Sequence, residues 1–451
     1  MTEAIDIPAE PILGDSWEAT DGNPAAEHLQ AQFLVSPCGI FVTMLTTNPA
    51  ERDSLTEDQR GLGSRILGFD IDSGKQLWSQ DLRQITGQGD PALYNDPSYT
   101  PSCRMVISTV DMLPQPQSLF LVSLSINLYT GDNAMLSTGD RAYCQAATDG
   151  WAGCYGETPE QGSWAVNLDD PSSPNWHEAS DTDTYSAYGD VVAAGRIWTP
   201  EGYRDPATDT VDFGMDTQLG GDTEFGAAYV EPYTPGGYRS GVVVRLGGGL
   251  GSNLNTCDIM RWDTTGQDTG LWPEGQSTPC GGVHTFVVAG GALLITYQSD
   301  PQYTATTSAY ALSDGTFLWQ REGTLWPTLF DRAYTGADKV MGISQSYAIF
   351  TTSGKADDIV RISDGADVRN PAIGTPILAQ TMAYEATMVP GGPFYFLAYQ
   401  LDPGNPDAQP DQVWSLHISD QTQRVWTFAT NGTMYLVYGN GSMSVAPLLV
   451  T

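Results

Sequence analysis

The chain has 451 residues, including 49 Gly and 29 Pro, and this composition disfavours long helices and favours many short strands joined by turns. Its 54 acidic residues against 19 Lys and Arg give a formal net charge of −35, which argues against partners such as nucleic acids or anionic membranes. The charge favours neutral, cationic or calcium-bridged partners, with solubility of a β-rich protein as the alternative interpretation.

Residues 1–30 are predicted to form an extended segment that precedes the repeats. The start, MTEAIDIPAEPILGD, has neither a basic region nor a hydrophobic stretch, so it is not a signal peptide. No apolar run in the chain approaches the length of a transmembrane helix. If the protein is exported, we expect that its signal or membrane anchor has been removed from this chain.

A repeated unit is clearest at residues 65–78. In Arg65–Trp78, alternating apolar residues lead into an Asp/Gly turn, and a strand with an aromatic residue leaves it. Similar units occur at Ala309–Trp319 and Val413–Trp426. Period-2 alternation on both sides of a tight turn is typical of a β-hairpin.

Weaker copies of the unit fill the intervals between the clear ones. Together the copies predict turns near residues 73, 131, 170, 208, 265, 314, 364 and 421. This spacing suits four short strands and their loops in each unit. Residues 31–451 are therefore predicted to form an all-β fold, a single β-propeller of eight four-stranded blades. Seven blades is the alternative, because weak repeats are easily miscounted.

The C-terminal residues indicate how such a ring could close. Residues 433–445 read as a hairpin around Asn440 and Gly441, but no Asp/Gly turn and Trp strand follow. The first unit has early strands at Gln32–Val35 and Ile40–Leu45. We hypothesise that the last strands join the first blade, which would remove two exposed sheet edges.

The segment Asp70–Trp78, with the pattern D-x-x-S-G-K-x-L-W, resembles the repeat of the PQQ-like (quinoprotein-like) β-propeller family. Fainter copies lie at Asp314–Trp319 and Asp420–Trp426. The family includes quinoprotein dehydrogenases and non-enzymatic members, such as the propeller lipoprotein of the outer-membrane protein assembly machinery. The resemblance implies that the tryptophans that end these segments dock neighbouring blades, namely Trp78, Trp319 and Trp426.

Cofactor and metal sites are weakly indicated. The chain has no adjacent Cys pair and cannot be matched to the rest of the quinoprotein constellation, so we expect neither PQQ nor redox catalysis. Asp70 and Asp72, followed by Gly74, resemble the opening of a calcium loop. A β-turn whose Asp side chains bind nearby backbone N–H groups is the favoured interpretation. Four His and no C-x-x-C spacing argue against zinc.

The cysteines favour an oxidising compartment. An even number of scattered Cys fits disulfides, whereas buried free thiols in a cytosolic protein are the alternative. Several pairings remain open. We favour a bridge across one hairpin, a second around a long loop, and a third between two Pro/Ser contexts. The favoured pairs are Cys144 with Cys154, Cys257 with Cys280, and Cys38 with Cys103.

The leading interpretation is an extracytoplasmic propeller, secreted or on the cell surface of a bacterium, that binds another protein or an envelope component without catalysis. Loops on rigid scaffolds commonly carry function, so Asn95–Ser102, Tyr229–Tyr238 and Asp402–Gln412 are candidate binding segments. Structural decoration is the alternative for all three. The alternative functions are a quinoprotein-like oxidoreductase and a calcium-dependent propeller that binds or hydrolyses carbohydrate.

Overall fold

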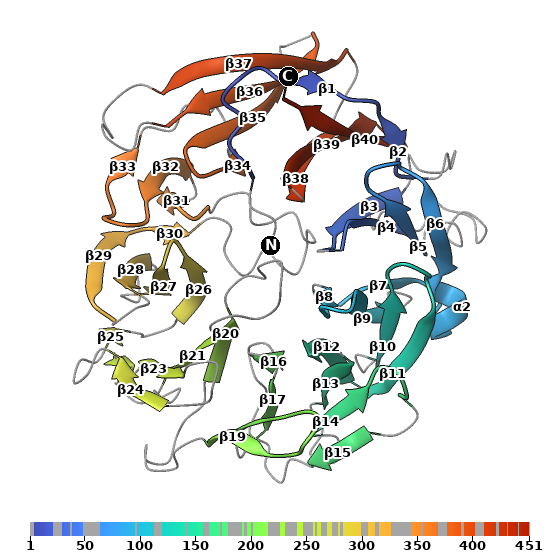
Figure 1. Ribbon diagram of the computed structural model, residues 1–451. Helices are drawn as coiled ribbons and strands as arrows, with labels where there is room; N and C mark the ends of the chain where they lie inside the picture. Colours follow the sequence, from blue (N-terminus) through green and yellow to red (C-terminus); the bar gives the residue numbers. More distant parts are fainter. Residues whose placement is uncertain are drawn as a thin grey trace.

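In the computed structural model, antiparallel sheets are arranged in a ring around a central axis, each with an edge strand toward the centre (Figure 1). The structure describes residues 4–20, 29–36, 38–47, 64–94, 97–111, 120–140, 142–148, 150–156, 162–171, 174–178, 192–193, 196–199, 202–214, 226–230, 241–246, 256–257, 259–262, 268–272, 278–279, 283–298, 305–311, 315–325, 344–352, 355–368, 377–388, 392–401, 410–420, 424–430, 432–440 and 442–450. This arrangement is a β-propeller, as the sequence predicted.

The sheets are numbered here in chain order around the ring. Sheet 1 consists of β3 (Leu29–Val35), β4 (Ile40–Thr47), β5 (Arg65–Asp70) and β6 (Gln76–Asp81). Sheet 2 consists of β7 (Pro91–Leu93), β8 (Ser98–Tyr99), β9 (Arg104–Asp111), β10 (Phe120–Asn127) and β11 (Asn133–Asp140). Sheet 3 consists of β12 (Ala142–Thr148), β13 (Trp151–Gly156), β14 (Gly162–Asn167) and β15 (Pro174–Glu178).

The next three sheets complete the side of the ring opposite sheet 1 (Figure 1). Sheet 4 consists of β16 (Val192–Ala193), β17 (Arg196–Thr199), β18 (Gly202–Arg204) and β19 (Val211–Gly214). Sheet 5 consists of β20 (Gly226–Val230), β21 (Gly241–Leu246), β23 (Ile259–Trp262) and β24 (Asp268–Trp272), and β22 (Thr256–Cys257) pairs separately with β25 (Thr278–Pro279). Sheet 6 consists of β26 (Val283–Ala289), β27 (Ala292–Gln298), β28 (Ala305–Ala311) and β29 (Phe317–Glu322).

The last three sheets return to the start of the chain. Sheet 7 consists of β30 (Thr324–Leu325), β31 (Tyr347–Thr352), β32 (Lys355–Arg361) and β33 (Asp367–Val368). Sheet 8 consists of β34 (Ile377–Leu378), β35 (Met382–Met388), β36 (Phe394–Gln400) and β37 (Asp411–Ser419). Sheet 9 combines β38 (Arg424–Thr430), β39 (Thr433–Asn440) and β40 (Ser442–Leu449) with the N-terminal strands β1 (Ile12–Leu13) and β2 (Trp17–Glu18).

The described strands thus form nine sheets of four or five strands, whereas we expected eight blades or, alternatively, seven. Seven of the predicted turns do fall between the last two strands of sheets 1 to 7. The predicted turn near residue 421 instead separates β37 from β38, which belong to different sheets. The count from sequence was low because sheet 9 takes its outer strands from the N-terminus and has no motif turn of its own.

Middle strands are apolar on both faces because each sheet lies between two neighbours. Along β4, Val42 and Met44 enter the core shared with sheet 2, while Phe41 and Leu45 enter the core shared with sheet 9. Successive side chains of a strand point to opposite faces, so one strand serves two cores. The five-residue helix α2 (Leu82–Thr86) follows β6, and no helix among the described residues is long and apolar enough to cross a membrane.

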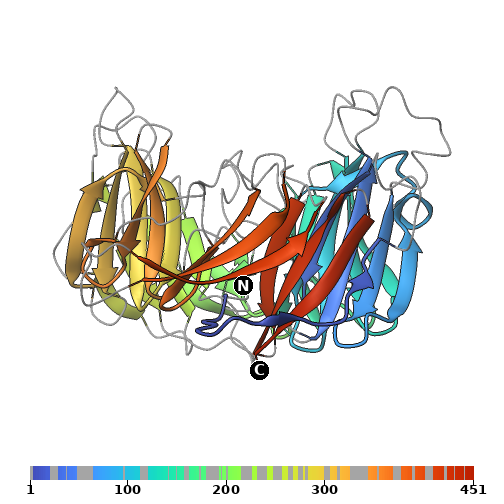
Figure 2. The ribbon, with the colours of Figure 1, turned by 90° about the horizontal axis from the view of Figure 1, so that it is seen from above.

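The ring closes in the direction opposite to our hypothesis. Sheet 1 has four strands of its own, and the N-terminal segment supplies the outer strands of the C-terminal sheet. Ile12 pairs with Leu449, and Trp17 pairs with Val445. Residues 4–20 are called the strap below. Figure 2 shows the strap running along the side of the ring on which the C-terminus lies. A three-stranded sheet has an unpaired outer edge, and the strap covers it.

The first residues of the strap are fixed on sheet 8. The Tyr384 hydroxyl donates to Ile5 O at 2.7 Å and accepts from Ile7 N at 2.8 Å. The Asp6 carboxylate accepts from the backbone N and the hydroxyl of Thr381, at 2.9 and 2.8 Å. Ile7 is fully buried. These contacts bind the start of the chain to residues more than 370 positions away.

A glycine in the sheet 7 turn tests the packing between sheets. Gly365 has a φ of +71°, and a Cβ there would meet Trp319 Cγ at 2.7 Å. Gly291 has the same φ, but a Cβ there would meet nothing within 4 Å. Both Gly→Ala variants should lose about 1–2 kcal/mol through the left-handed backbone. Gly365→Ala should lose about 1–3 kcal/mol more through overpacking, as measured by denaturant unfolding. Equal losses in the two variants would contradict the docking described below.

Candidate functional site

Tryptophan side chains join one sheet to the next. Trp78, on the outer strand of sheet 1, is 6% exposed, and its Nε1 donates to Leu128 O of sheet 2 at 2.6 Å. Trp319, on the outer strand of sheet 6, is 7% exposed, and its Nε1 donates to Ile362 O of sheet 7 at 2.6 Å. In both joints the acceptor is the residue directly after the last strand but one of the next sheet. The indole therefore covers the turn and satisfies a carbonyl that the sheet leaves free.

The third tryptophan predicted to dock is Trp426. It lies on β38, the strand of sheet 9 farthest from β40, and its side chain lies outside the described residues. The outer strand of sheet 8 carries Trp414 instead, whose Nε1 donates to Ile7 O of the strap at 2.7 Å. Sequence spacing missed Trp414 because it follows Gly404 by ten positions, whereas Trp78 follows Gly74 by four.

Two further joints vary the same arrangement. Trp176 of sheet 3 donates to Asp205 O of sheet 4 at 3.3 Å. Between sheets 2 and 3 an arginine replaces the indole. Arg104 donates to Leu168 O at 3.2 Å and forms a 2.8 Å ion pair with Asp169. The recurring requirement is a donor for one carbonyl, and the sequence satisfies it with different residue types.

Trp17 of the strap completes the series between sheets 9 and 1. Its ring lies 5.5 Å from that of Phe41 and 5.2 Å from that of Phe69, and it covers Gly74. Its Nε1 is buried, and among the described residues it has no hydrogen-bond partner. Nothing in the sequence marked Trp17, because it lies in the segment that we expected to precede the propeller.

Two disulfides are present in the described part of the chain, and both match favoured pairings. Cys144 and Cys154 are directly paired across β12 and β13, with Cα atoms 4.0 Å apart. Cys38 and Cys103 join the β3–β4 turn of sheet 1 to the β8–β9 turn of sheet 2. The first bridge lies within a sheet, and the second links two sheets. The side chain of Cys257, together with Cys280, lies outside the described residues.

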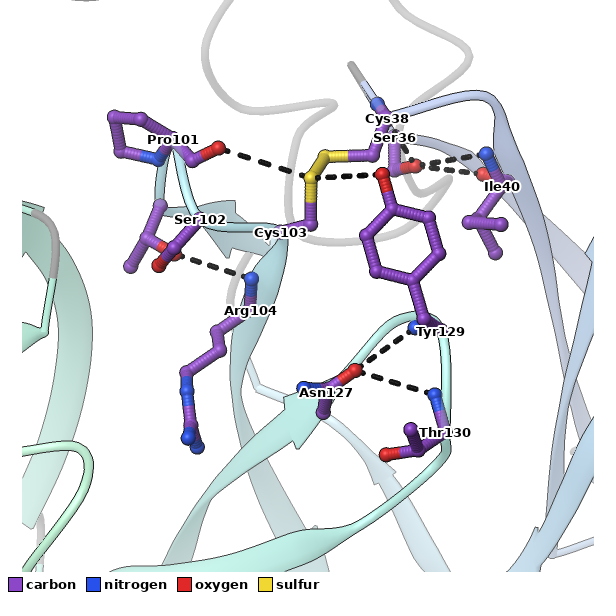
Figure 3. Close-up of a disulfide and its surroundings, with 11 residues drawn as sticks. Ser36, Cys38, Ile40, Pro101, Ser102, Cys103, Arg104, Asn127, Tyr129 and Thr130 are labelled. Atoms are coloured by element: carbon purple, nitrogen blue, oxygen red, sulfur yellow. Dashed lines mark hydrogen bonds between the residues drawn. A yellow bond between two sulfur atoms is a disulfide. The ribbon is translucent and has the colours of Figure 1, made fainter.

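The turn that carries Cys103 is held by its own backbone. Cys103 has a φ of +64°, its amide donates to Thr100 O at 3.0 Å, and the Arg104 amide donates to Thr100 Oγ1 at 3.1 Å. Figure 3 shows the Tyr129 hydroxyl directed at the bridge, where it donates to Cys103 Sγ at 3.5 Å. Tyr129 is otherwise 54% exposed. The bridge therefore sits at a rigid turn beside an exposed aromatic side chain.

The calcium candidates Asp70 and Asp72 make turn contacts. The Asp70 carboxylate accepts from both the backbone N and the hydroxyl of Ser73, and these hydrogen bonds lower the pKa of Asp70. Asp72 accepts from the Tyr435 hydroxyl of sheet 9 at 3.3 Å. No group of three or more potential metal-ligating side chains lies among the described residues. Calcium binding here stays a prediction.

Three tyrosines form a row along the inner rim of the ring at sheet 3. The ring of Tyr94, which follows β7, lies 5.9 Å from that of Tyr143 on β12, and Tyr143 lies 6.3 Å from Tyr155 on β13. Tyr94 is 38% exposed and Tyr155 is buried. β12, which carries Tyr143, is the edge strand of sheet 3 that lies toward the centre of the ring in Figure 1.

Polar contacts between inner strands hold this row in place. The Tyr94 amide donates to Ser108 O at 2.8 Å, which continues the pairing of β7 with β9. Ser108 Oγ accepts from the Cys144 amide at 3.2 Å, and Ser98 Oγ accepts from the Ala146 amide at 2.7 Å. These hydroxyls satisfy the edge N–H groups of β12 from the neighbouring sheet. The tyrosine row therefore stands on a cross-linked and rigid edge.

The candidate binding segments lie largely outside the described residues. Within Asn95–Ser102, residues 97–102 are described and include β8 and the turn before Cys103. Most of Tyr229–Tyr238 and of Asp402–Gln412 is not. Tyr94 stands directly before the first of these segments, and its sequence context gave no signal that it would be exposed at the rim.

No protein-family model and no curated protein matches the chain. Among solved structures, it is similar to the propeller domain of the trilobed protease from Pyrococcus furiosus, with a TM-score of 0.33, 8% identity and coverage of 90% of this chain and 89% of that one. An acylaminoacyl peptidase matches with a TM-score of 0.34, 11% identity and coverage of 90% and 57%. A eukaryotic initiation factor matches with a TM-score of 0.33, 10% identity and coverage of 87% and 89%. At these scores, the sheet topology alone carries the fold assignment.

Replacing docking indoles by phenyl rings should separate hydrogen bonding from packing. Trp78→Phe removes the donor of a buried carbonyl, so it should cost about 1–3 kcal/mol more than the ring loss alone. Trp17→Phe loses a comparable part of the ring but no hydrogen bond, and it serves as the matched control. Equilibrium denaturant unfolding of both variants measures the difference. If Trp17→Phe lost as much stability as Trp78→Phe, the assigned roles of the two N–H groups would be wrong.

The bridge between sheets 1 and 2 should stabilise the protein by restricting the unfolded chain. Its cysteines are 65 residues apart in sequence, so the double variant Cys38→Ala/Cys103→Ala should lose about 4 kcal/mol of unfolding free energy. The cysteines of the other bridge are 10 residues apart in sequence. The variant Cys144→Ala/Cys154→Ala should therefore lose about 3 kcal/mol of unfolding free energy through the same effect. Denaturant unfolding without reductant gives both values. A loss below about 1 kcal/mol for the first variant would contradict the expectation.

Proposed function

We propose that the protein is an extracytoplasmic member of the PQQ-like propellers that binds another protein or a cell-envelope component, without catalysis. Three features of the described chain support the proposal: a ring locked by indole contacts, two disulfides, and an exposed aromatic side chain at the inner rim. We propose no cofactor for this activity. The rim around Tyr94 and Tyr143 is the binding surface.

The exposure of Tyr94 is the observation that carries the proposal. A tyrosine offers a large contact area and a hydroxyl at a low entropic cost, and such side chains dominate the binding energy of many interfaces. Tyr94 is 38% exposed, yet it is positioned by the Tyr143 ring and by its own backbone bond to Ser108. Because the side chain is held before a ligand arrives, binding would order few groups.

The net charge supports a neutral or cationic partner, and the disulfides support an extracytoplasmic location. The net charge of −35 favours a partner surface that is neutral or cationic at the point of contact. Disulfides persist in oxidising compartments and are rare in the cytosol. The buried position of Cys144 and Cys154 and the link between sheets through Cys103 would both stabilise a protein outside the cell.

Replacing the exposed rim tyrosine should abolish binding. Immobilised protein is incubated with a solubilised envelope fraction of the source organism, and the retained species are quantified by mass spectrometry. Tyr94→Ala should reduce retention by about tenfold or more, since truncation of an interface aromatic commonly costs at least that. Tyr129→Ala is the matched control, because Tyr129 is 54% exposed but lies on the β10–β11 turn beside the Cys38–Cys103 disulfide. Equal retention by all three proteins, with equal melting temperatures, would contradict the proposal.

A further inference from the structure

The contact between sheet 9 and sheet 1, called the closing joint below, contains a continuous apolar core. Phe41, Leu67 and Phe69 of sheet 1 pack against Val437 and Val445 of sheet 9, with Trp17 of the strap beside them. Tyr435 of sheet 9 donates to Asp72 of sheet 1 at 3.3 Å. The closing joint thus has the apolar filling of the other joints, together with the Tyr435–Asp72 hydrogen bond.

The closing joint lacks the hydrogen bond that four other joints share. The indole N–H groups of Trp78, Trp176, Trp319 and Trp414 each donate to a backbone carbonyl of the neighbouring unit, at 2.6 to 3.3 Å. The buried Nε1 of Trp17 has no such partner among the described residues. Docking of Trp17 therefore takes its N–H out of water, and no described residue replaces the lost hydrogen bond, which opposes closure.

Two of the other joints carry additional links between their sheets. Between sheets 1 and 2, Gln80 donates to Gly131 O at 2.8 Å, and the Cys38–Cys103 disulfide adds a covalent link. Between sheets 6 and 7, Gly290 donates to Gln345 at 2.8 Å, and Arg321 forms an ion pair with Asp367. The strand that carries Trp17 is itself two residues long.

We propose that the ring opens at the closing joint, while sheet 9 and the strap stay together as one unit. The strap keeps its pairing with β40 and its anchors on sheet 8, and the chain through residues 21–28 still connects it to sheet 1. Opening exposes the side chains of the closing joint to solvent and leaves the hydrogen bonds within each sheet intact. The inference is independent of the binding surface proposed at Tyr94.

Two neighbouring residues of β40 provide the test. Val445 and Ala446 are both fully buried, but their side chains point to opposite faces of the sheet. Val445 belongs to the closing joint, whereas Ala446 pairs with Leu436, which faces sheet 8. Val445→Cys and Ala446→Cys are made in the full chain, and the rate of thiol labelling is measured without reductant at increasing denaturant concentrations.

Val445→Cys should be labelled at least tenfold faster than Ala446→Cys in native buffer, at a rate that changes little at low denaturant. Equal rates would show that β40 unfolds as a strand or that the whole protein unfolds, and either result would overturn the proposal. If Val445→Cys does not fold, Ala19→Cys replaces it, since Ala19 is fully buried in the closing joint. Its control is Ala309→Cys, which is fully buried in the core beneath Trp319. Faster labelling of Ala19→Cys than of Ala309→Cys supports the proposal, and equal rates overturn it.

Discussion

One constraint recurs around this ring: the carbonyl directly after the last strand but one of a sheet needs a donor from the preceding sheet. Trp78 and Trp319 supply an indole N–H from the outer strand of the preceding sheet, whereas Arg104 supplies a guanidinium from β9, a middle strand of sheet 2. A sheet in this fold has cores on both faces, so its stability depends on both neighbours. The hydrogen bond from this donor fixes how one sheet is positioned against the next. Apolar side chains then fill the space between the two sheets.

The strap applies the same rule at the ends of the chain. Trp414 finds its carbonyl on Ile7, and Trp17 covers the sheet 1 turn at Gly74 as Trp78 covers the sheet 2 turn at Gly131. The strap therefore accepts a hydrogen bond from sheet 8 through Ile7 O. It also provides the Trp17 side chain that packs on sheet 1. Its two short strands would add little stability by themselves. They stabilise the ring because the strap connects three sheets.

Local turn chemistry made the fold predictable from the sequence. The residues that contact each other over long sequence distances could not be predicted. Gly74 and Gly365 have left-handed backbones that Asp/Gly turns supply, so the hairpins could be read from short segments. The roles of Trp414 and Trp17 depend on residues at the other end of the chain, which no local pattern encodes. Trp426 follows an Asp at the motif spacing, but it lies on β38, the edge strand of sheet 9 opposite the strap. The chain between Asp420 and Trp426 connects sheet 8 to sheet 9. Tyr94 required the structure, since its exposure at the rim depends on how sheets 2 and 3 meet.

The anchoring of Asp6 and Ile7 has a consequence for biosynthesis. Their partners, Thr381 and Trp414, are 375 and 407 residues downstream, so they have not been translated when the N-terminus leaves the ribosome. At about 5–20 residues per second, the first residues wait for roughly 20–90 s before their binding site exists. Throughout that interval the earlier sheets form while Asp6 and Ile7 still lack their partners, so the strap is anchored only after sheet 8 has been synthesised.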